Sequence, residues 1–187
     1  MSRVIHVFRT PDRFIAGTVG EPGDRTFYLQ AIDEAKVVSV QMEKGQVAVL
    51  AERLSALLDE VVRRLGAGAT ESGELPMDTE PLNTPVEQEF RVGTMGLGWD
   101  IESRAIVVEL LAVSEQEIDE SMVLDDSEEG PDAVRVFLSL EQARAFAVRA
   151  ERVISAGRRP CPLCKEPLGP KGHICPRQNG YRRQVEA

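Results

Sequence analysis

Twice along the chain, short segments rich in β-branched and aromatic residues lead into a stretch with helical periodicity. In the first series, turn-forming stretches such as GEPGD and DEA separate the apolar segments RVIHVFR, RFIAGTV, TFYLQAI and KVVSVQM. Such segments are typical of antiparallel strands, so we expect a meander of four strands. The next apolar residues recur at steps of three and four, which predicts a helix that ends at Gly66 and packs on the sheet. They are Val47, Leu50, Leu54, Leu57, Leu58, Val61 and Leu65.

The second series begins with EFRVGTM, RAIVVELLAV and AVRVFLSL, which predict three further strands. We interpret the glycines of GTMGLGW as a hairpin turn. Ser139 and Gln142 have the spacing of a capping box, so a second helix is expected to start there and to end at Gly157. Its apolar face is predicted to contain Ala143, Phe146, Ala147, Ala150, Val153 and Ile154.

The two strand-to-helix entries can be superposed with an offset of 96 residues, which places Val38 on Val134 and Gln46 on Gln142. An internal duplication would explain this likeness, and so would the general resemblance of one strand-to-helix unit to another. Either way the pattern predicts an α+β body over residues 1–157. We expect two antiparallel strand-meander-plus-helix halves, at residues 1–66 and 86–157.

Charge and composition predict the connections between these parts. Residues 67–85 are rich in Gly, Pro, Ser, Thr and acidic side chains, so we expect a mobile acidic linker between the halves. Residues 115–132 form a second stretch without Lys or Arg. Residues 151–187 instead carry eight basic and three acidic side chains, although the whole chain has a net charge of −9. We therefore expect residues 158–187 to form a separate tail.

All three cysteines and one of the two histidines lie in the stretch CPLCKEPLGPKGHIC of that tail. Cys161 and Cys164 have the C-x2-C spacing that turns two thiolates inward from one tight loop, and His173 and Cys175 share a face of an extended segment. This spacing predicts a zinc knuckle with four protein ligands, in which Zn²⁺ is structural because no position stays open for water. Metal binding would then supply most of the folding free energy of the tail.

Two other interpretations of this stretch are possible. Free thiols or a redox pair would also give a C-x2-C motif, although a redox pair normally starts a helix and Pro167 with the later glycines prevents one. Many zinc knuckles place Gly directly after the second Cys, whereas this chain has Lys165. The other histidine, His6, lies in an apolar segment and is expected to be packed, not functional.

The stretches RPCPLCKEPLGPKGHICPRQNGYRR, VGTMGLGWD and VRVFLSLEQARAFAVRAERV together resemble an actinobacterial family catalogued as domain of unknown function 3090. The resemblance covers nearly the whole chain. It implies no particular activity. Members of the family are often encoded beside a histidine-phosphatase-like and a lipid-kinase-like protein, which implies a role linked to phosphoryl-transfer enzymes.

Function classes can be narrowed further. The chain contains no Walker loop, no G-x-G-x-x-G, no nucleophile elbow and no H-E-x-x-H, so we expect no catalytic residues, although an enzyme of unrecognised type is a possible alternative. The leading expectation is a zinc-containing protein-interaction or adaptor module with a protein partner. A nucleic-acid binder is the other alternative, with Tyr181, Arg182 and Arg183 as contacts to bases or phosphates, but the acidic charge opposes it.

The compartment follows from the same features. No run approaches the roughly 18 apolar residues that span a bilayer, and the N-terminus lacks the apolar stretch of a signal peptide. An odd number of clustered cysteines also disfavours a disulfide framework. We expect a cytoplasmic protein with reduced thiols and no membrane contact.

Overall fold

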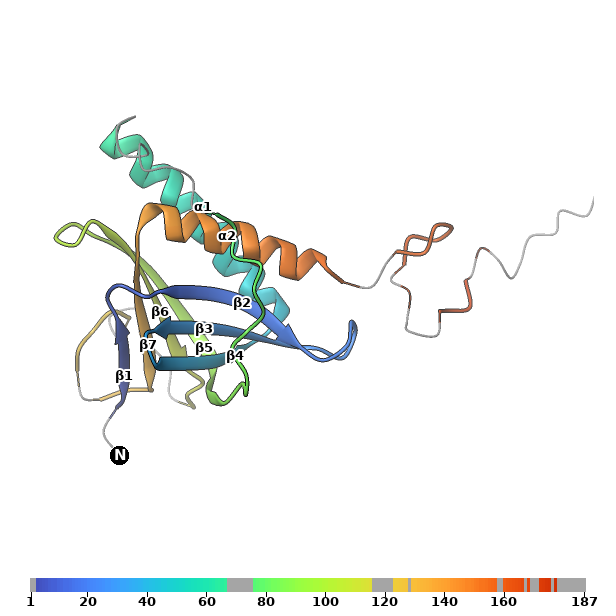
Figure 1. Ribbon diagram of the computed structural model, residues 1–187, viewed down its shortest axis with the longest axis horizontal. Coiled ribbons are helices and arrows are strands. Elements are labelled where there is room, and N and C mark those ends of the chain that lie inside the picture. The colour runs from blue at the N-terminus through green and yellow to red at the C-terminus, as the bar shows by residue number, and fades with distance from the viewer. Residues whose placement is uncertain are drawn as a thin grey trace, which may run out of the picture.

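The computed structural model describes residues 3–66, 76–115, 123–127, 129–157, 160–166, 168, 172–175 and 177. Within these ranges the chain forms one mixed sheet with two helices packed on it, as Figure 1 shows. The strands are β1 Ile5–Phe8, β2 Arg13–Val19, β3 Thr26–Asp33, β4 Lys36–Met42, β5 Gln88–Asp100, β6 Ala105–Ala112 and β7 Ala133–Leu138. The helices are α1 Lys44–Leu65 and α2 Leu140–Ser155. The predicted α+β class is therefore confirmed.

The seven strands are ordered β1-β7-β6-β5-β4-β3-β2. Strands β2 to β4 and β5 to β7 each form an antiparallel meander, and the two meanders meet where β4 pairs with β5 in parallel. Strands β1 and β2 stand at opposite edges of the sheet, yet residues 9–12 alone connect them. The sheet must therefore curve until its two edges approach each other, and Lys36 Nζ on β4 donates to the carbonyl of Val7 on β1 at 3.4 Å.

The prediction of four strands in the first meander is wrong in one respect. Strand β1 leaves that meander and pairs in parallel with β7, with Ile5 opposite Ala133. The two predicted halves otherwise correspond to β2-β3-β4-α1 and β5-β6-β7-α2. Whether they arose by duplication stays a prediction.

One face of the curved sheet and the inner faces of both helices form the hydrophobic core. On β6 and β7 alternate residues point into this core, because side chains of a strand alternate between its two faces. The buried residues of α1 repeat at helical spacing, and α2 packs against both α1 and β2. The predicted helical faces are thus confirmed at Val47, Leu50, Leu54, Leu58, Val61, Ala143, Phe146, Ala147 and Ala150.

Both helices start with a glutamine in the third helical position whose side chain returns to the backbone. Gln142 Oε1 accepts from the backbone N–H of Ser139 at 3.1 Å, and Ser139 Oγ accepts from Gln142 N at 3.1 Å, which confirms the predicted capping box. Gln46 likewise accepts from the backbone N–H of Glu43 at 2.9 Å. Helix α2 ends at Ser155 and is capped by Ala156, one residue before the predicted Gly157.

The described part of the predicted mobile linker is held against the body. Leu82 is buried and covers Gly17 of β2, where an added Cβ would lie 2.5 Å from Leu82 Cγ. The carboxylate of Asp78 accepts hydrogen bonds from Arg13 at 2.6 and 3.0 Å. The prediction of mobility is therefore wrong for residues 76–85, and residues 67–75 lie outside the described residues.

The glycines predicted to form a hairpin turn instead lie within β5, at positions 93, 96 and 98. The turn follows at residues 101–104, and β5 pairs with β6 up to Asp100 and Ala105. Loop residues cover these glycines, so small residues serve here to admit a neighbouring segment. No helix in the described part of the chain is long and apolar enough to span a membrane.

Candidate metal centre

The C-x2-C segment forms a tight turn that directs its two thiols inward. The backbone N–H of Lys165 donates to the carbonyl of Cys161 at 2.9 Å, and the N–H of Cys161 donates to the carbonyl of Glu166 at 2.7 Å. Lys165 has a φ of 67°, in the left-handed region that glycine adopts most readily. Zinc knuckles often have glycine at this position. Lys165 adopts the same left-handed backbone conformation here, at a cost of about 1–2 kcal/mol.

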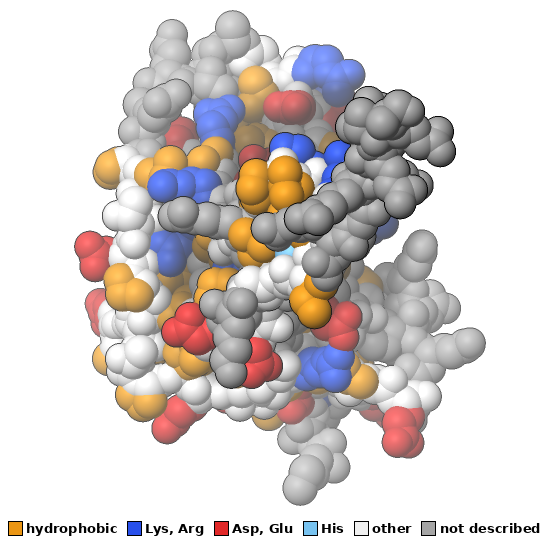
Figure 2. Space-filling view, turned by 90° about the vertical axis from the view of Figure 1, so that its right-hand side faces the viewer, with side chains coloured by type: hydrophobic (Ala, Val, Ile, Leu, Met, Phe, Trp, Pro, Cys, Tyr) orange, Lys and Arg blue, Asp and Glu red, His pale blue; other side chains and the backbone are white. Residues whose placement is uncertain are grey.

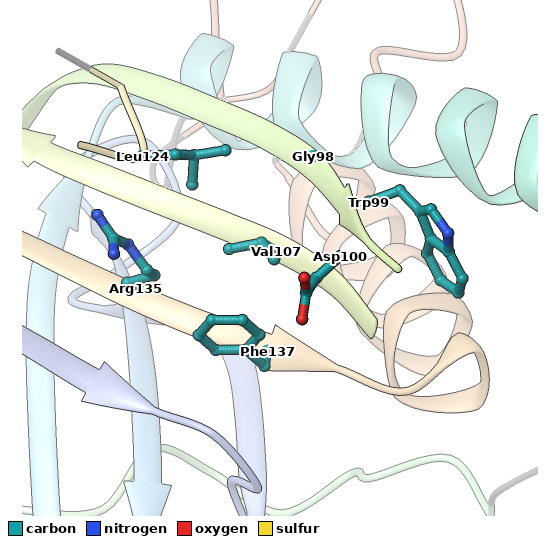
Figure 3. A pocket seen from close by; sticks show the side chains of 7 residues that line it. All are labelled: Gly98, Trp99, Asp100, Val107, Leu124, Arg135 and Phe137. Carbon is teal, nitrogen blue, oxygen red and sulfur yellow. The ribbon is translucent and has the colours of Figure 1, made fainter. Parts of the chain in front are cut away.

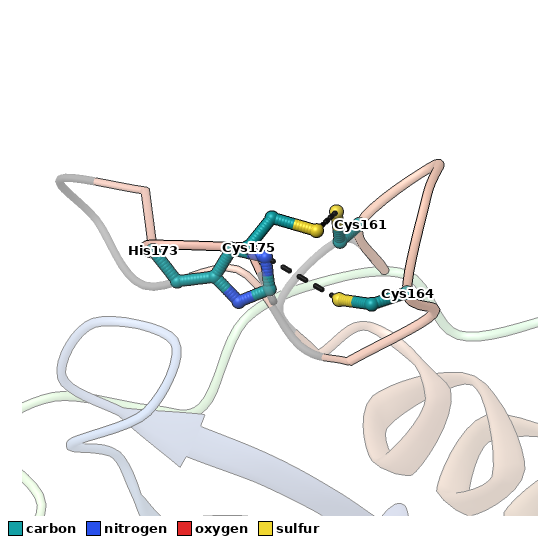
Figure 4. A group of neighbouring side chains, drawn as sticks. All are labelled: Cys161, Cys164, His173 and Cys175. Carbon is teal, nitrogen blue, oxygen red and sulfur yellow. Dashed lines mark hydrogen bonds between the residues drawn. The ribbon is translucent and has the colours of Figure 1, made fainter. Parts of the chain in front are cut away.

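The structure brings all four predicted ligand residues together, as Figure 4 shows. Their donor atoms all lie within 4.8 Å of one another. Cys161 Sγ and Cys175 Sγ are 3.8 Å apart, and Cys164 Sγ is 3.4 Å from His173 Nε2. Each close pair therefore combines one donor from the C-x2-C turn with one donor from residues 173–175, and the group can hold a metal ion.

The two distances fit a tetrahedral ion of the size of zinc. With Zn–S bonds of about 2.3 Å and Zn–N bonds of about 2.0 Å, two thiolates of one tetrahedron stand about 3.8 Å apart, and a thiolate and an imidazole nitrogen about 3.5 Å apart. A disulfide needs sulfurs at about 2.0 Å, and all three cysteines are free. These two distances are compatible with such an ion, and soft thiolates with one imidazole are donors that suit zinc.

Burial and hydrogen bonding differ between the thiols, and so does the ease with which each loses its proton. Cys161 and Cys175 are buried, whereas Cys164 and His173 are half-buried. Backbone N–H groups of Cys164 and Leu163 lower the pKa of the Cys161 thiol to about 6, so a thiolate is present there near neutral pH. Desolvation, together with the neighbouring Cys161, raises the pKa of the Cys164 thiol. Metal binding would therefore have to displace a proton from Cys164.

The remaining predicted contacts are only partly described. Tyr181, Arg182 and Arg183 lie outside the described residues. Arg177 is described, and its Nη1 donates to the carbonyl of Leu163 at 3.1 Å, which ties the end of the segment back to the C-x2-C turn. His6 is paired instead with Glu89, at 3.1 Å between Nε2 and Oε1, and takes no part in the metal group.

Sequence reasoning missed a second group of charged residues, on the face of the sheet opposite the core. Glu109 of β6 is fully buried and accepts two hydrogen bonds from Arg135 of β7, at 2.7 and 2.9 Å. The signal was available in the sequence, because each residue interrupts an otherwise apolar strand, in VVELL and AVRVFL. Buried charges of this kind are rarely found unless they are paired.

Fold and site together define an α+β protein whose C-terminal segment carries a Cys3His group able to hold a metal ion. The chain belongs to the family described as protein of unknown function (DUF3090), whose model matches residues 6–175. The match includes strands β2 to β7, all of β1 except Ile5, both helices and all four donor residues, and it ends at the donor residue Cys175. No curated protein and no solved structure matches the chain.

Proposed function

We propose that Cys161, Cys164, His173 and Cys175 bind one structural Zn²⁺. The proposal is supported by the spacing of the donor atoms and by the donor set, since four protein ligands leave no position for a reacting water. The segment has few apolar residues of its own, so the ion would provide the energy that holds it folded, on the order of 10 kcal/mol. In this proposal the ion has no catalytic role.

We infer further that the metal-braced segment is a contact surface for a protein partner. The observation that carries this inference is that each ligand pair presents an apolar side chain to solvent beside it. Leu163, between Cys161 and Cys164, is 47% exposed, and Ile174, between His173 and Cys175, is 82% exposed. Figure 2 views the molecule from the side on which this segment lies in Figure 1, and hydrophobic side chains reach the surface there. An aliphatic side chain on a rigid, small loop offers a partner buried area at low entropic cost. The chain would then act as a non-catalytic adaptor.

Elemental analysis tests the metal, and a pull-down tests the adaptor role. Purified protein should contain about one zinc per chain, and each single Cys→Ser variant should contain less. For the partner, we would compare proteins retained by the wild type with those retained by an Ile174→Asp variant, which keeps all four donors. Full zinc in every ligand variant would refute the site. Equal retention by Ile174→Asp and the wild type would refute the contact surface while leaving the metal assignment intact.

A salt series distinguishes the adaptor from a nucleic-acid binder. A nucleic-acid binder should retain single-stranded or duplex probes at low salt and lose affinity steeply as salt rises, because counterions are released from the phosphates. The adaptor should bind neither probe at low salt. Probe binding that disappears in an Arg182→Ala, Arg183→Ala variant would favour the nucleic-acid alternative.

A further inference from the structure

A pocket opens on the face of the sheet that is turned away from the helices. Gly98, Val107 and Phe137 stand side by side on β5, β6 and β7, because Gly98 pairs with Val107 and Val107 with Phe137. This row forms the floor of a hollow of about 210 Å³, with Leu124 and Arg135 on one side and Asp100 on the other (Figure 3). The hollow exists because Gly98 contributes no side chain to the row.

The floor is apolar and does not belong to the main core. Val107 and Phe137, together with Ala105, form a small hydrophobic cluster of their own. Leu124 closes one side, and a Cβ added at Gly98 would lie 3.0 Å from its Cδ1. An apolar cavity of about 150 Å³ is large enough for one benzene, so this pocket accommodates a single ring with a small substituent.

The charges around the pocket favour a cation over an anion. The guanidinium of Arg135 is already engaged by Glu109, by Asp126 and by the carbonyl of Asp125 at 3.0 Å. It therefore offers little attraction to a further anion. Asp100 accepts hydrogen bonds from the backbone and hydroxyl of Ser103, the latter being the main cause of its lowered pKa, so its carboxylate is ionised at neutral pH.

A cation of the chain itself, Arg9, already lies against one wall of this pocket. The guanidinium of Arg9, which follows β1, lies over the ring of Phe137 at 4.6 Å from the ring centroid. The negative face of an aromatic ring attracts a positive group at this distance. Figure 3 shows the carboxylate of Asp100 close to the same phenylalanine, and the charge of Arg9 also acts on that carboxylate, so the ring and the carboxylate already serve one cation, the exposed side chain of Arg9.

We propose that this pocket binds a small aromatic cation, with its flat ring on Val107 and Phe137 and its positive group beside Asp100, where it would take the place of the exposed Arg9 guanidinium. Benzamidinium has this chemistry and serves as the probe. Benzoate has the same shape with a negative charge, and benzyl alcohol has the same ring without a charge. Comparing the three separates the contribution of the ring from that of the charge. The site is independent of the metal centre and of the adaptor role proposed above.

The binding test is a titration of ¹⁵N-labelled full-length protein followed by NMR. Trp99 lies between the pocket residues Gly98 and Asp100, but its indole packs on the opposite, core-facing side of the sheet, so its backbone amide N–H serves as the signal. Benzamidinium should shift this signal and the amide signals of Gly98, Val107 and Leu124 saturably. Benzyl alcohol should bind about two- to fivefold more weakly, as expected for the loss of one exposed charge contact, and benzoate more weakly still. The absence of saturable shifts, or equal binding of benzoate, would overturn the proposal.

Variants locate the probe. Gly98→Val should abolish binding because its side chain fills the hollow, and valine is well tolerated in a strand. Asp100→Asn should weaken benzamidinium binding about two- to fivefold and bring it to the level of benzyl alcohol. Glu102→Gln, which removes an exposed charge of the adjacent turn outside the pocket, should bind like the wild type. Undiminished binding by a folded Gly98→Val variant would exclude this pocket. If that variant does not fold, the wild-type shifts decide, since shifts confined to residues far from Gly98 would overturn the assignment.

Discussion

Arg149 of α2 donates two hydrogen bonds to Asp78, one to its backbone carbonyl and one to its carboxylate. Asp78 belongs to the crossover segment, residues 76–85, which is part of the connection between α1 and β5. The same guanidinium donates to the carbonyl of Ala16 on β2 at 2.8 Å and to that of Glu80 at 2.7 Å. A helix, a strand and a connecting segment therefore share one buried cation. This arrangement holds the crossover in place without any regular secondary structure in it.

Replacing this guanidinium should destabilise the whole body. In Arg149→Met the aliphatic part of the side chain is kept, but the carbonyls of Ala16, Asp78 and Glu80 and the Asp78 carboxylate each lose one hydrogen bond. Buried groups without partners cost about 1–3 kcal/mol each, so we expect a loss of about 3 kcal/mol in the free energy of unfolding, measured with urea. Arg144→Met, on the exposed side of the same helix, is the control and should change it by less than about 0.5 kcal/mol. Equal effects of the two variants would contradict the role of Arg149.

Acid should weaken the same junction. The hydrogen bond from Arg13 is the main cause that lowers the pKa of Asp78 below 3.8. A carboxylate whose pKa is lower in the folded than in the unfolded state stabilises the fold above its unfolded pKa, and this stability is lost as the pH falls through the folded value. Asp78→Asn should therefore be less stable than the wild type at pH 7, and the difference should shrink towards pH 3. Unfolding curves at both pH values check this, with the exposed Asp59→Asn as control.

The paired charges behind the pocket of Figure 3 make a third prediction. Glu109→Gln would leave Arg135 with the exposed Asp126 as its remaining opposite charge, and removing one partner of a buried pair costs about 3–5 kcal/mol. Thermal unfolding should show the loss as a clear decrease in Tm. A Glu109→Leu, Arg135→Leu double variant should recover most of the stability, since it removes both charges at once. A double variant as unstable as the single one would show that the pair is not the cause.

Removing the metal should affect the tail alone. With a strong chelator, we expect faster tryptic cleavage after Lys165 and Arg177, located by mass spectrometry, because the loop would lose the ion that we propose closes it. The Tm of the body should change by less than about 2 °C, since sheet and helices have a core of their own. A large decrease in Tm on chelation would show that tail and body unfold as one unit.

Local patterns predicted the elements that depend on neighbours in sequence. Period-two and helical spacing located six of the seven strands in their meanders and both helices, and the spacing of Cys161 to Cys175 located the metal group. The predictions that failed concern contacts between residues far apart in the sequence. The parallel pairing of β1 with β7 has no local signal, and neither do the hydrogen bonds from Arg13 and Arg149 to backbone carbonyls that fix residues 76–85. Gly96 and Gly98 resembled turn residues because the segment that covers them is remote in the sequence.

The pairing of β1 with β7 also governs the order in which the protein can assemble. During synthesis, Ile5 is added to the chain 128 residues before its partner Ala133. The meander β2-β3-β4 and α1 can form from neighbouring segments at once, whereas the N-terminal strand must wait until almost the whole body has been made. Contacts between such distant residues close slowly, because the loop entropy is lost before the contacts form. The first strand to be translated is therefore among the last to be incorporated.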